Sequence, residues 1–223
     1  EFRRVLFRSI ILNTTITLVR HGETNWNVLG KFQGCKDIVL SNEGILQAQY
    51  LNERFQNKFD YIYTSPLKRA RETAEIISKD SDIIPIIEPG ITEIDFGEWE
   101  GLTIKEVETN FPKELVQWRT DELNGPMCGG EISLKIASIR AKEAILNIAT
   151  KHPGKKIIIV AHGGIIKAGL LGIFDLKMTM YHKIILGNTS VCKIIFNNEL
   201  SPKIITLNDT SHLPDNYRIK SYV

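Results

Sequence analysis

The stretch Lys156-Ile157-Ile158-Ile159-Val160-Ala161-His162-Gly163-Gly164 decides the fold, because an apolar run ends abruptly in a histidine and two glycines. Such an uninterrupted apolar run is typical of a central strand in a parallel sheet that is covered on both faces. A second run, Thr15-Ile16-Thr17-Leu18-Val19, ends in Arg20-His21-Gly22 in the same way. Both runs therefore predict buried strands that deliver a histidine to the carboxyl edge of one sheet.

Working outward, strands and helices alternate along the chain. Further strands are predicted at 60–64 and 83–87, and an antiparallel hairpin at 190–196 and 203–207. Apolar spacing and capping residues predict helices at 41–57, 67–78, 131–150 and 165–173. This alternation predicts an α/β protein with three α/β/α layers and a mostly parallel central sheet.

Two of these helices carry more specific expectations. Ser65 is expected to cap the helix at 67–78, with Pro66 in its first turn. In the helix at 131–150, much of the buried face is expected to come from Ile132, Ile136, Ile139, Ala144, Ile145 and Ile148.

The domain organisation is predicted to be simple. Residues 10–223 are expected to form one domain, with short helices and loops at about 99–130 inserted as a lid. Residues 1–9 hold three arginines and one glutamate and resemble a translated sequencing adapter, so we expect them to be non-native and exclude them from the fold.

Charge and cysteine content bound the class of protein. The net charge is +2, and residues 1–9 contribute all of it, so the remainder is neutral. A neutral domain without a long apolar run gives no reason to expect nucleic acid or a membrane as partner. Three scattered cysteines, Cys35, Cys128 and Cys192, form no zinc or disulfide pattern and predict reduced thiols in a cytoplasmic protein.

Residues suited to phosphate chemistry follow the predicted parallel strands. Arg20 and His21 end the first strand, the stretch 65–71 follows the second, Glu93 comes after the third, and His162 ends the fourth. Carboxyl ends of parallel strands share one rim, so these side chains are expected to converge. Guanidinium groups match phosphate oxygens, neutral imidazole is a nucleophile, and a carboxylic acid protonates a leaving oxygen. Together they could transfer a phosphoryl group without metal.

The ordered motifs resemble the histidine phosphatase superfamily, also called phosphoglycerate mutase-like, over about residues 14–213. The resemblance rests on several segments at family-like spacings, namely Arg20-His21-Gly22-Glu23-Thr24, Phe32-Gln33-Gly34, Thr64-Ser65-Pro66-Leu67-Lys68-Arg69-Ala70, Glu93-Ile94-Asp95-Phe96-Gly97-Glu98-Trp99-Glu100-Gly101, Gly129-Gly130-Glu131 and Val160-Ala161-His162-Gly163-Gly164. Ordered matches of this kind are far more specific than any single motif.

The resemblance implies a role for each matching residue. His21 would become phosphohistidine, and Glu93 would act first as general acid and then as base. The residues that would hold the phosphoryl group are Arg20, Arg69 and His162. Residues expected near the substrate are Thr24, Asn27, Gln33, Gly34 and Gly163. No metal and no cofactor is expected.

Some assignments stay open at this point. Arg69 is preferred over Arg71 because the family pattern places the functional arginine directly before Ala70, and one helix cannot point residues i and i+2 the same way. His182 and His212 lie in predicted loop and tail segments, where either could approach the site.

Three functions are considered. The favoured one is a metal-independent phosphomonoester hydrolase that forms phosphohistidine and acts on a small phosphorylated metabolite. The stretch 93–101 resembles the phosphatase branch, including broad-specificity and alpha-ribazole phosphatases, and lacks the longer insertion of the mutases. A 2,3-bisphosphoglycerate-dependent phosphoglycerate mutase is the first alternative. A non-catalytic phosphoryl-binding protein is the second, although it would be expected to lack His21 or Glu93. The oligomeric state and the substrate stay undetermined.

Overall fold

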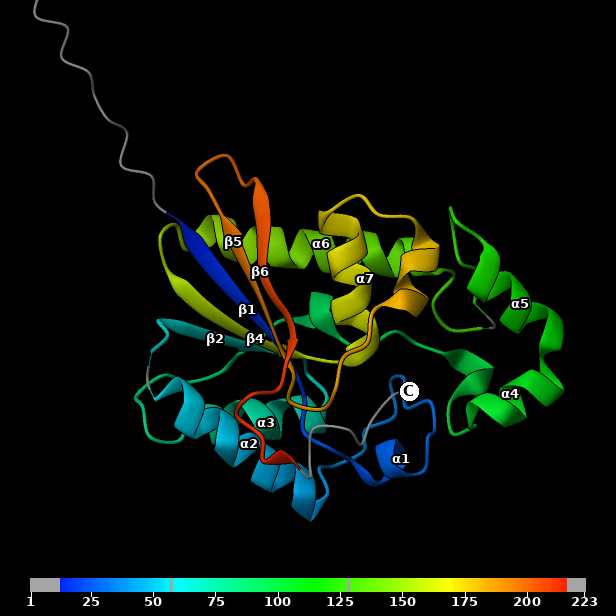
Figure 1. The fold of residues 1–223 in the computed structure, drawn as a ribbon, viewed down its shortest axis with the longest axis horizontal. Coiled ribbons are helices and arrows are strands. Elements are labelled where there is room, and N and C mark those ends of the chain that lie inside the picture. The colour runs from blue at the N-terminus through cyan, green and yellow to red at the C-terminus, as the bar shows by residue number, and fades with distance from the viewer. Residues whose placement is uncertain (1–12, 57, 128, 216–223) are drawn as a thin grey trace, which may run out of the picture.

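The central sheet has six strands in the order β3-β2-β4-β1-β5-β6 (Figure 1). The computed structural model describes residues 13–56, 58–127 and 129–215, so the predicted segment 1–9 lies outside the described residues. β1, β2, β3 and β4 run parallel, β5 is antiparallel to β1, and β6 is antiparallel to β5. The strands are Thr14–Arg20, Tyr61–Thr64, Ile86–Ile87, Lys156–Ala161, Val191–Phe196 and Pro202–Asp209, in chain order. The predicted mostly parallel sheet is confirmed.

Helices cover both faces of the sheet, which confirms the three layers. α2 (Asn42–Phe55) and α3 (Lys68–Ser78) lie on one face, and α6 (Leu134–Lys151) and α7 (Gly163–Ile173) lie on the other (Figure 1). Each pair encloses its own apolar cluster against the strands. The remaining helices are α1 (Asn25–Val28), α4 (Ile104–Asn110) and α5 (Pro112–Thr120), with 3-10 turns at Pro89–Ile91, Gly97–Trp99 and Met178–Lys183.

The strand register brings the sequence motifs together. Arg20 pairs with Ala161 across β1 and β4, so the following residues, His21 and His162, leave the sheet side by side. Thr64 pairs with Val160 across β2 and β4, which places the chain after β2 beside the same point. Parallel pairing therefore produces one rim from three segments that lie far apart in the sequence.

The structure corrects the predicted helix cap at Ser65. Leu67 occupies the N-cap position of α3, and the Ser65 hydroxyl lies 2.7 Å from Nε2 of His162 instead. The Ser65 hydroxyl also accepts the backbone N–H of Leu67 at 3.4 Å, but Ser65 lies two residues ahead of the N-cap and so does not cap α3. The N-cap therefore lies two residues later than predicted, and Pro66 precedes the first turn of α3 rather than lying in it.

The structure also corrects the expected face of α6. Ile132, Ile136 and Ile139 are exposed, whereas Ala144, Ile145 and Ile148 are buried as expected. The remaining buried side chains of the helix come from Leu134, Ala137, Ser138, Ala141 and Ala149. Small residues on this face allow α6 to pack closely on α7, where the backbone carbonyl of Ser138 lies beside Gly172.

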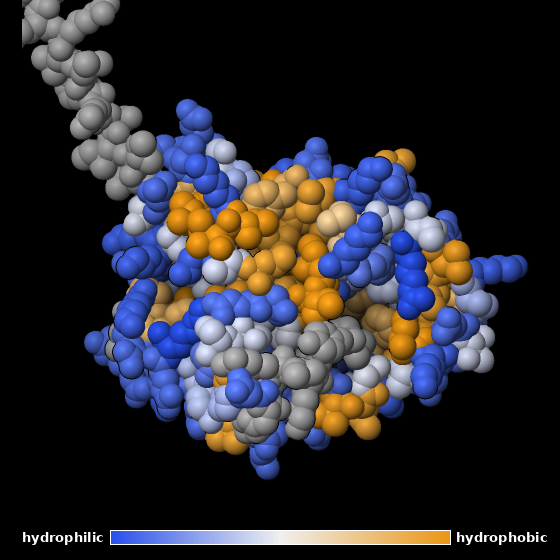
Figure 2. All heavy atoms as spheres, in the orientation of Figure 1, coloured by the Kyte–Doolittle hydropathy of each residue, from blue (hydrophilic) through white to orange (hydrophobic). Residues whose placement is uncertain are grey.

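The predicted lid supplies α4 and α5, which extend sideways beyond the sheet (Figure 1). Figure 2 shows the molecule hollowed between this extension and the sheet, with hydrophobic residues around the hollow. Position 128 of the expected lid lies outside the described residues. Of the described helices, none is long and apolar enough to cross a membrane. Cys35 and Cys192 are free thiols, as expected.

Candidate active site

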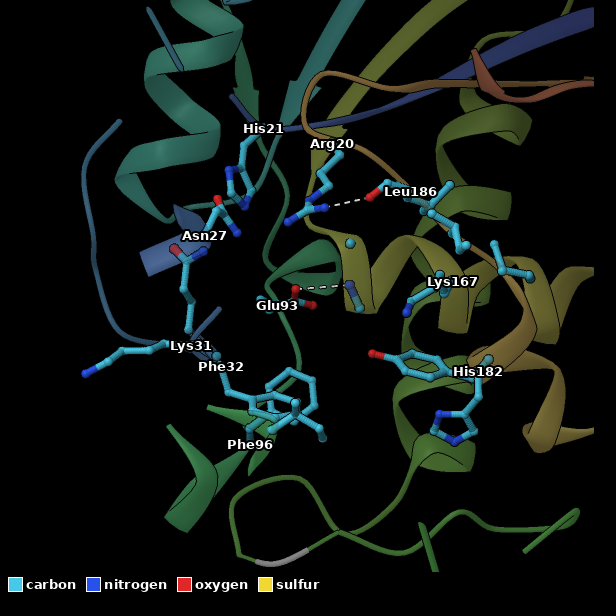
Figure 3. Close-up of a pocket in the computed structure, with 18 of the residues that line it drawn as sticks. Arg20, His21, Asn27, Lys31, Phe32, Glu93, Phe96, Lys167, His182 and Leu186 are labelled. Carbon is cyan, nitrogen blue, oxygen red and sulfur yellow. Dashed lines mark hydrogen bonds between the residues drawn. The ribbon is translucent and has the colours of Figure 1, made fainter. Parts of the chain in front are cut away.

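A cavity of about 590 Å³ opens at the carboxyl edge of the sheet. Four of the five predicted catalytic residues line it: Arg20, His21, Arg69 and Glu93 (Figure 3). They come from the end of β1, the first turn of α3 and the loop after the 3-10 turn Pro89–Ile91. The convergence expected from parallel-strand geometry is therefore present.

His21 is held in one ring orientation and one tautomer. Its Nδ1 lies 2.6 Å from the carbonyl oxygen of Gly22, which can only accept a proton, so Nδ1 carries the N–H. The lone pair is therefore on Nε2, which accepts from Nε of Arg69 at 3.3 Å. Burial, reinforced by Arg69 and Arg20, holds the pKa of His21 well below its usual 6.5. His21 is thus a neutral imidazole at neutral pH, the form that can act as a nucleophile.

Arg69 is buried and joins the two histidines to the loop after Gln33. Its Nε donates to Nε2 of His21 and, at 3.1 Å, to Nδ1 of His162. Its Nη1 and Nη2 donate at 2.7 Å to the carbonyl oxygens of Lys36 and Gly34. The guanidinium therefore fixes the wall of the cavity as well as contributing its charge. Arg71, by contrast, is exposed, as the i, i+2 spacing predicted.

His162 lies behind this layer and is fully buried. Its Nδ1 accepts from Arg69, so Nε2 carries the proton and donates to Ser65 Oγ at 2.7 Å. Burial, with Arg69, His21 and Arg20 nearby, lowers the pKa of His162 well below 6.5. Of the predicted catalytic residues that the structure describes, His162 is the one outside the cavity lining.

Arg20 approaches the cavity from the end of β1. Its Nη1 donates to the carbonyl oxygen of Leu186 at 2.6 Å, which anchors the far side of the cavity (Figure 3). A Cβ added to Gly163 would lie 3.3 Å from Nε of Arg20, so the glycine lets α7 begin directly against the guanidinium. Burial lowers the pKa of Arg20 to about 10, which leaves it charged at neutral pH.

Glu93 is placed by the amino-terminal turn of α7. Its carboxylate accepts from the backbone N–H groups of Gly164 at 3.0 Å and Ile165 at 2.7 Å, and from its neighbour Ile94 at 2.9 Å. Helix N-termini offer unpaired N–H groups and a positive dipole end, both of which favour an anion. A Cβ at Gly164 would lie 2.6 Å from Glu93 Oε1, so this position requires glycine for the contact to form.

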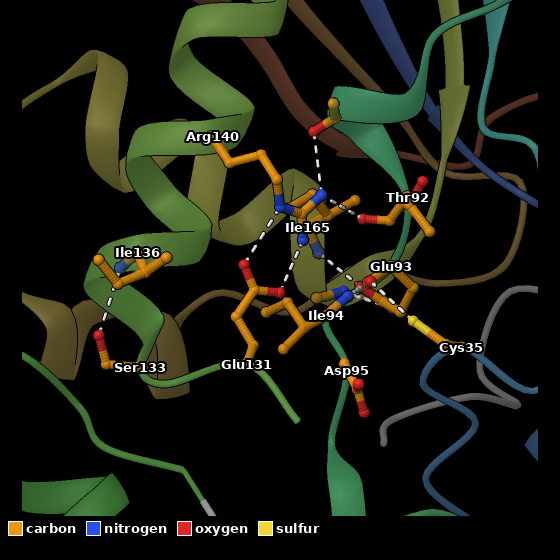
Figure 4. Close-up of polar contacts among 12 residues, drawn as sticks. Cys35, Thr92, Glu93, Ile94, Asp95, Glu131, Ser133, Ile136, Arg140 and Ile165 are labelled. Atoms are coloured by element: carbon orange, nitrogen blue, oxygen red, sulfur yellow. Dashed lines mark hydrogen bonds and ion pairs between the residues drawn. The ribbon is translucent and has the colours of Figure 1, made fainter. Parts of the chain in front are cut away.

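A further arginine, Arg140, holds the backbone that leads into Glu93. Arg140 of α6 donates from Nη1 to the carbonyl oxygens of Gly90 at 3.1 Å and Thr92 at 2.9 Å (Figure 4). Its Nε and Nη2 donate to the carboxylate of Glu131 at 3.1 and 2.7 Å. Such a bidentate pair fixes the guanidinium plane and therefore the segment that leads into Glu93.

The residues predicted near the substrate fall into two groups. The first group lines the cavity and consists of Asn27, Gln33, Gly34 and Gly163. Thr24 forms the second group: it is fully buried and is not among the described residues that line the cavity. Thr24 Oγ1 donates to Gln33 Oε1 at 3.0 Å and lies 3.1 Å from Asn27 Oδ1, so it contacts two lining residues from behind.

Sequence reasoning missed much of the outer cavity. Lys167 of α7, Tyr181, Trp118 and Arg119 all line it, and so does His182, which the sequence analysis had left open. Lys167 lies four positions after Gly163, so the helical period could have placed it on the same face. The others come from α5 and the 3-10 turn Met178–Lys183, which only the tertiary fold brings to the site.

His212 lies outside the cavity lining. His212 contacts Arg54 and Thr189 rather than lining the cavity. Within the described parts of the chain, no group of three or more His, Cys, Asp and Glu side chains is arranged to hold a metal ion.

Comparison with known proteins places this geometry in a family. Residues 16–210 match the family described as Histidine phosphatase superfamily (branch 1). The chain belongs to the histidine phosphatase superfamily. Phosphoserine phosphatase 1 of Hydrogenobacter thermophilus is 31% identical over 203 residues, which are 91% of this chain and 95% of that protein. The metal-independent phosphoserine phosphatase of Arabidopsis thaliana is 36% identical over 163 residues, 72% of this chain and 68% of its own.

Solved structures of phosphatases are also similar to this histidine phosphatase. A mutant phosphoserine phosphatase from Entamoeba histolytica in complex with phosphoserine is 37% identical, with a TM-score of 0.84 over 90% of this chain and 100% of that chain. The same enzyme is known in complex with 3-phosphoglyceric acid. Some other relatives carry the name phosphoglycerate mutase. Family, fold and phosphatase relatives together make this chain a phosphatase that hydrolyses phosphomonoesters.

Proposed function

We propose that this histidine phosphatase hydrolyses a small phosphorylated metabolite in two steps through phosphohistidine at His21, without a metal ion. The observation that carries the assignment is the bond from His21 Nδ1 to the Gly22 carbonyl. This bond leaves the lone pair on Nε2, in the cavity and beside the Arg69 guanidinium. An uncharged nucleophile next to a fixed cation is what in-line attack on a phosphate ester requires.

In the first step, Nε2 of His21 attacks phosphorus and the bond from phosphorus to the ester oxygen breaks. Glu93 supplies the proton that the departing oxygen needs. Arg20 and Arg69 offset the negative charge on the phosphoryl oxygens, and both stay charged at neutral pH. His162 holds Nε of Arg69 from behind, which positions the guanidinium.

In the second step, water attacks the phosphohistidine and the bond from phosphorus to Nε2 breaks. Glu93 accepts the proton of that water, which restores the acid for the next turnover. Inorganic phosphate leaves, and His21 returns to the neutral tautomer that the Gly22 carbonyl selects. A mutase would use the same first step but transfer the phosphoryl group to a second substrate hydroxyl instead of water.

The substrate is a phosphomonoester small enough for a cavity of about 590 Å³. Five cationic side chains and one carboxylate line that cavity, which favours an anionic ligand. Relatives that act on or bind phosphoserine and 3-phosphoglycerate make such compounds the first to assay. Residues 10–223 would act as one domain, in which α4 and α5 of the 99–130 lid cover the substrate.

The decisive experiment traps the intermediate. Wild-type protein mixed with ³²P-labelled phosphoserine and quenched in base should retain acid-labile label, and His21→Ala should retain none and lose hydrolysis. His152→Gln, which changes a histidine outside the cavity lining, is the matched control and should label normally. Normal turnover by His21→Ala, or complete loss of wild-type activity in chelator with recovery on adding divalent metal, would overturn the mechanism. Release of phosphate against formation of a phosphorylated product separates hydrolase from mutase.

A further inference from the structure

We propose that Lys167 forms a subsite for a second anionic group of the substrate, one helical turn away from the phosphoryl-binding end of the cavity. The proposal rests on the proposed function and deepens it. The substrate class would be phosphomonoesters that carry a second negative charge on a short carbon skeleton, with a carboxylate as the fitting group.

The first observation is a cation inside the cavity for which the described residues supply no anionic partner. Lys167 lines the cavity and is partly buried. Among the described residues, no carboxylate lies within 4.0 Å of its ammonium group, and no hydrogen bond forms to it. Its contact is the ring of Tyr181, with Nζ 4.0 Å from the ring centroid. Enclosed charges are normally paired, so the ammonium is suited to an anion that arrives with the ligand.

The second observation is the position of Lys167 relative to the phosphoryl end. Gly163 lies against the Arg20 guanidinium, and Lys167 follows four residues later on the same face of α7. Four residues of helix rise about 6 Å, which is the scale of a two- or three-carbon skeleton between two anionic groups. Figure 3 shows Lys167 pointing from α7 into the cavity, toward the side on which Glu93 lies.

The third observation is that the other cationic side chains of the cavity lining either contact other groups of the protein or lie exposed to solvent. Arg20 donates to Leu186, and Arg69 donates to Gly34 and Lys36, at the end where His21 lies. Lys31 interacts electrostatically with the carboxylate of Glu106, and its Nζ lies 5.9 Å from the Trp26 ring centroid. Arg119 is an exposed residue of α5, so solvent screens its charge. Lys167 is therefore the lining cation that is both enclosed and placed away from the phosphoryl group.

Tyr181 and Glu93 define how the ammonium is held. The Tyr181 ring beneath Nζ favours the charged form by a cation–π contact while leaving the other side of the ammonium to a ligand. The carboxylate oxygens of Glu93 accept hydrogen bonds from the N–H groups of Gly164 and Ile165. The carboxylate is thus held by the helix end rather than by Lys167.

The charge state of Lys167 supports a pH-dependent subsite. Burial and the positive charge of Arg20 lower the pKa of Lys167 to about 8, while Glu93 opposes the shift. Of the titratable groups near it, Tyr181 is kept neutral by burial, and His182 has a pKa that burial lowers. Free Lys167 is therefore protonated at pH 7 and loses its charge above about pH 8. A bound carboxylate would favour the protonated form and raise that pKa.

The test compares ligands that differ only in the second anion, using Lys167→Met with Lys135→Met as matched control. Lys135 is an exposed lysine on the neighbouring α6. Titration calorimetry measures phosphoserine against phosphoethanolamine, and 3-phosphoglycerate against glycerol 3-phosphate. All variants carry His21→Ala so that no ligand is hydrolysed. Ligand affinity measured in the His21→Ala background does not depend on turnover. A negative result for the subsite can therefore be distinguished from a negative result for the phosphatase mechanism.

We expect Lys167→Met to weaken phosphoserine and 3-phosphoglycerate about 10- to 100-fold, the effect of losing a charged hydrogen-bond partner. Phosphoethanolamine and glycerol 3-phosphate should change less than threefold, and Lys135→Met should leave all four unchanged. A pair with a second phosphate, ethylene glycol bisphosphate against its monophosphate, separates carboxylate from phosphate as the preferred anion. Equal weakening of both members of each pair, or no weakening, would overturn the subsite.

Discussion

Replacing Gly164 with alanine separates the placement of Glu93 from the stability of the fold. A Cβ at this position would lie 2.6 Å from Glu93 Oε1 and 3.0 Å from the Tyr181 hydroxyl. Ordinary contacts between heavy atoms need about 3.5 Å, so the carboxylate must move by about 1 Å. That movement weakens the hydrogen bonds from Gly164 and Ile165, which now measure 3.0 and 2.7 Å.

A displacement of about 1 Å in a reacting group costs about 10²-fold in rate, within the 10²- to 10⁴-fold that general acid–base catalysis supplies. We therefore expect kcat for an alkyl phosphate such as phosphoserine to fall about 100-fold. The fall should be smaller for para-nitrophenyl phosphate, whose leaving phenolate needs less help from an acid. Stability should hardly change, because the group that yields is the end of a flexible side chain and alanine is up to about 1 kcal/mol better than glycine in a helix.

The assay is steady-state hydrolysis of both esters alongside thermal unfolding. Gly187→Ala is the matched control, since a Cβ there would lie 3.7 Å from Cγ2 of Thr210 and 3.8 Å from Oδ1 of Asn208, which are ordinary contact distances. We expect the melting temperature of Gly164→Ala to stay within about 4 °C of wild type. Unchanged kcat for phosphoserine, or an equal loss for both esters, would refute the placement of Glu93 as the acid.

Two further predictions follow from the same site. Because burial and neighbouring cations lower the pKa of His21 below 6.5, its protonation should begin only below that pH. The fall of kcat/KM at low pH that belongs to His21 should therefore lie below pH 6.5. The imidazole NMR signal that disappears in His21→Ala should show no titration above pH 6.5. Titration of that signal near pH 7 would contradict the assignment. Arg140→Met removes the donors to the carbonyl oxygens of Gly90 and Thr92, so kcat should fall about tenfold, equivalent to about 1.4 kcal/mol, with KM little changed. Partial recovery in Arg140→Lys, measured by kcat with circular dichroism as a folding control, supports a positioning role, whereas a change in KM alone would argue against it.

The sequence predicted the strands well because the apolar runs are long and uninterrupted. β1 and β4 begin and end within one residue of the predicted bounds. Short strands at the edge of the sheet were less predictable. The strand expected at 83–87 is reduced to Ile86–Ile87, both exposed, since a short apolar run at a sheet edge carries little information about pairing.

The face of α6 shows why periodicity alone misled. Ile136 and Ile139 fit a helical spacing, but the structure buries Ala137 and Ala141 instead. Close packing against α7 favours small side chains at the interface, and the larger isoleucines remain outside. The space available between α6 and α7 decides which side chains of α6 are buried. The sequence of one helix does not contain that information.

By itself, the sequence determined which residues meet at the end of the cavity where we propose that the phosphoryl group binds. Each of Arg20, His21 and His162 directly follows or ends a strong strand, so a parallel sheet must bring them to one rim. Only the tertiary structure decided the tautomer of His21, the pairing of Ser65 with His162, and the attachment of Glu93 to the start of α7. It also decided which side chains form the outer cavity, Lys167 and Tyr181 among them. These features depend on contacts between segments more than 50 residues apart or on the exact orientation of a ring, and local patterns encode neither.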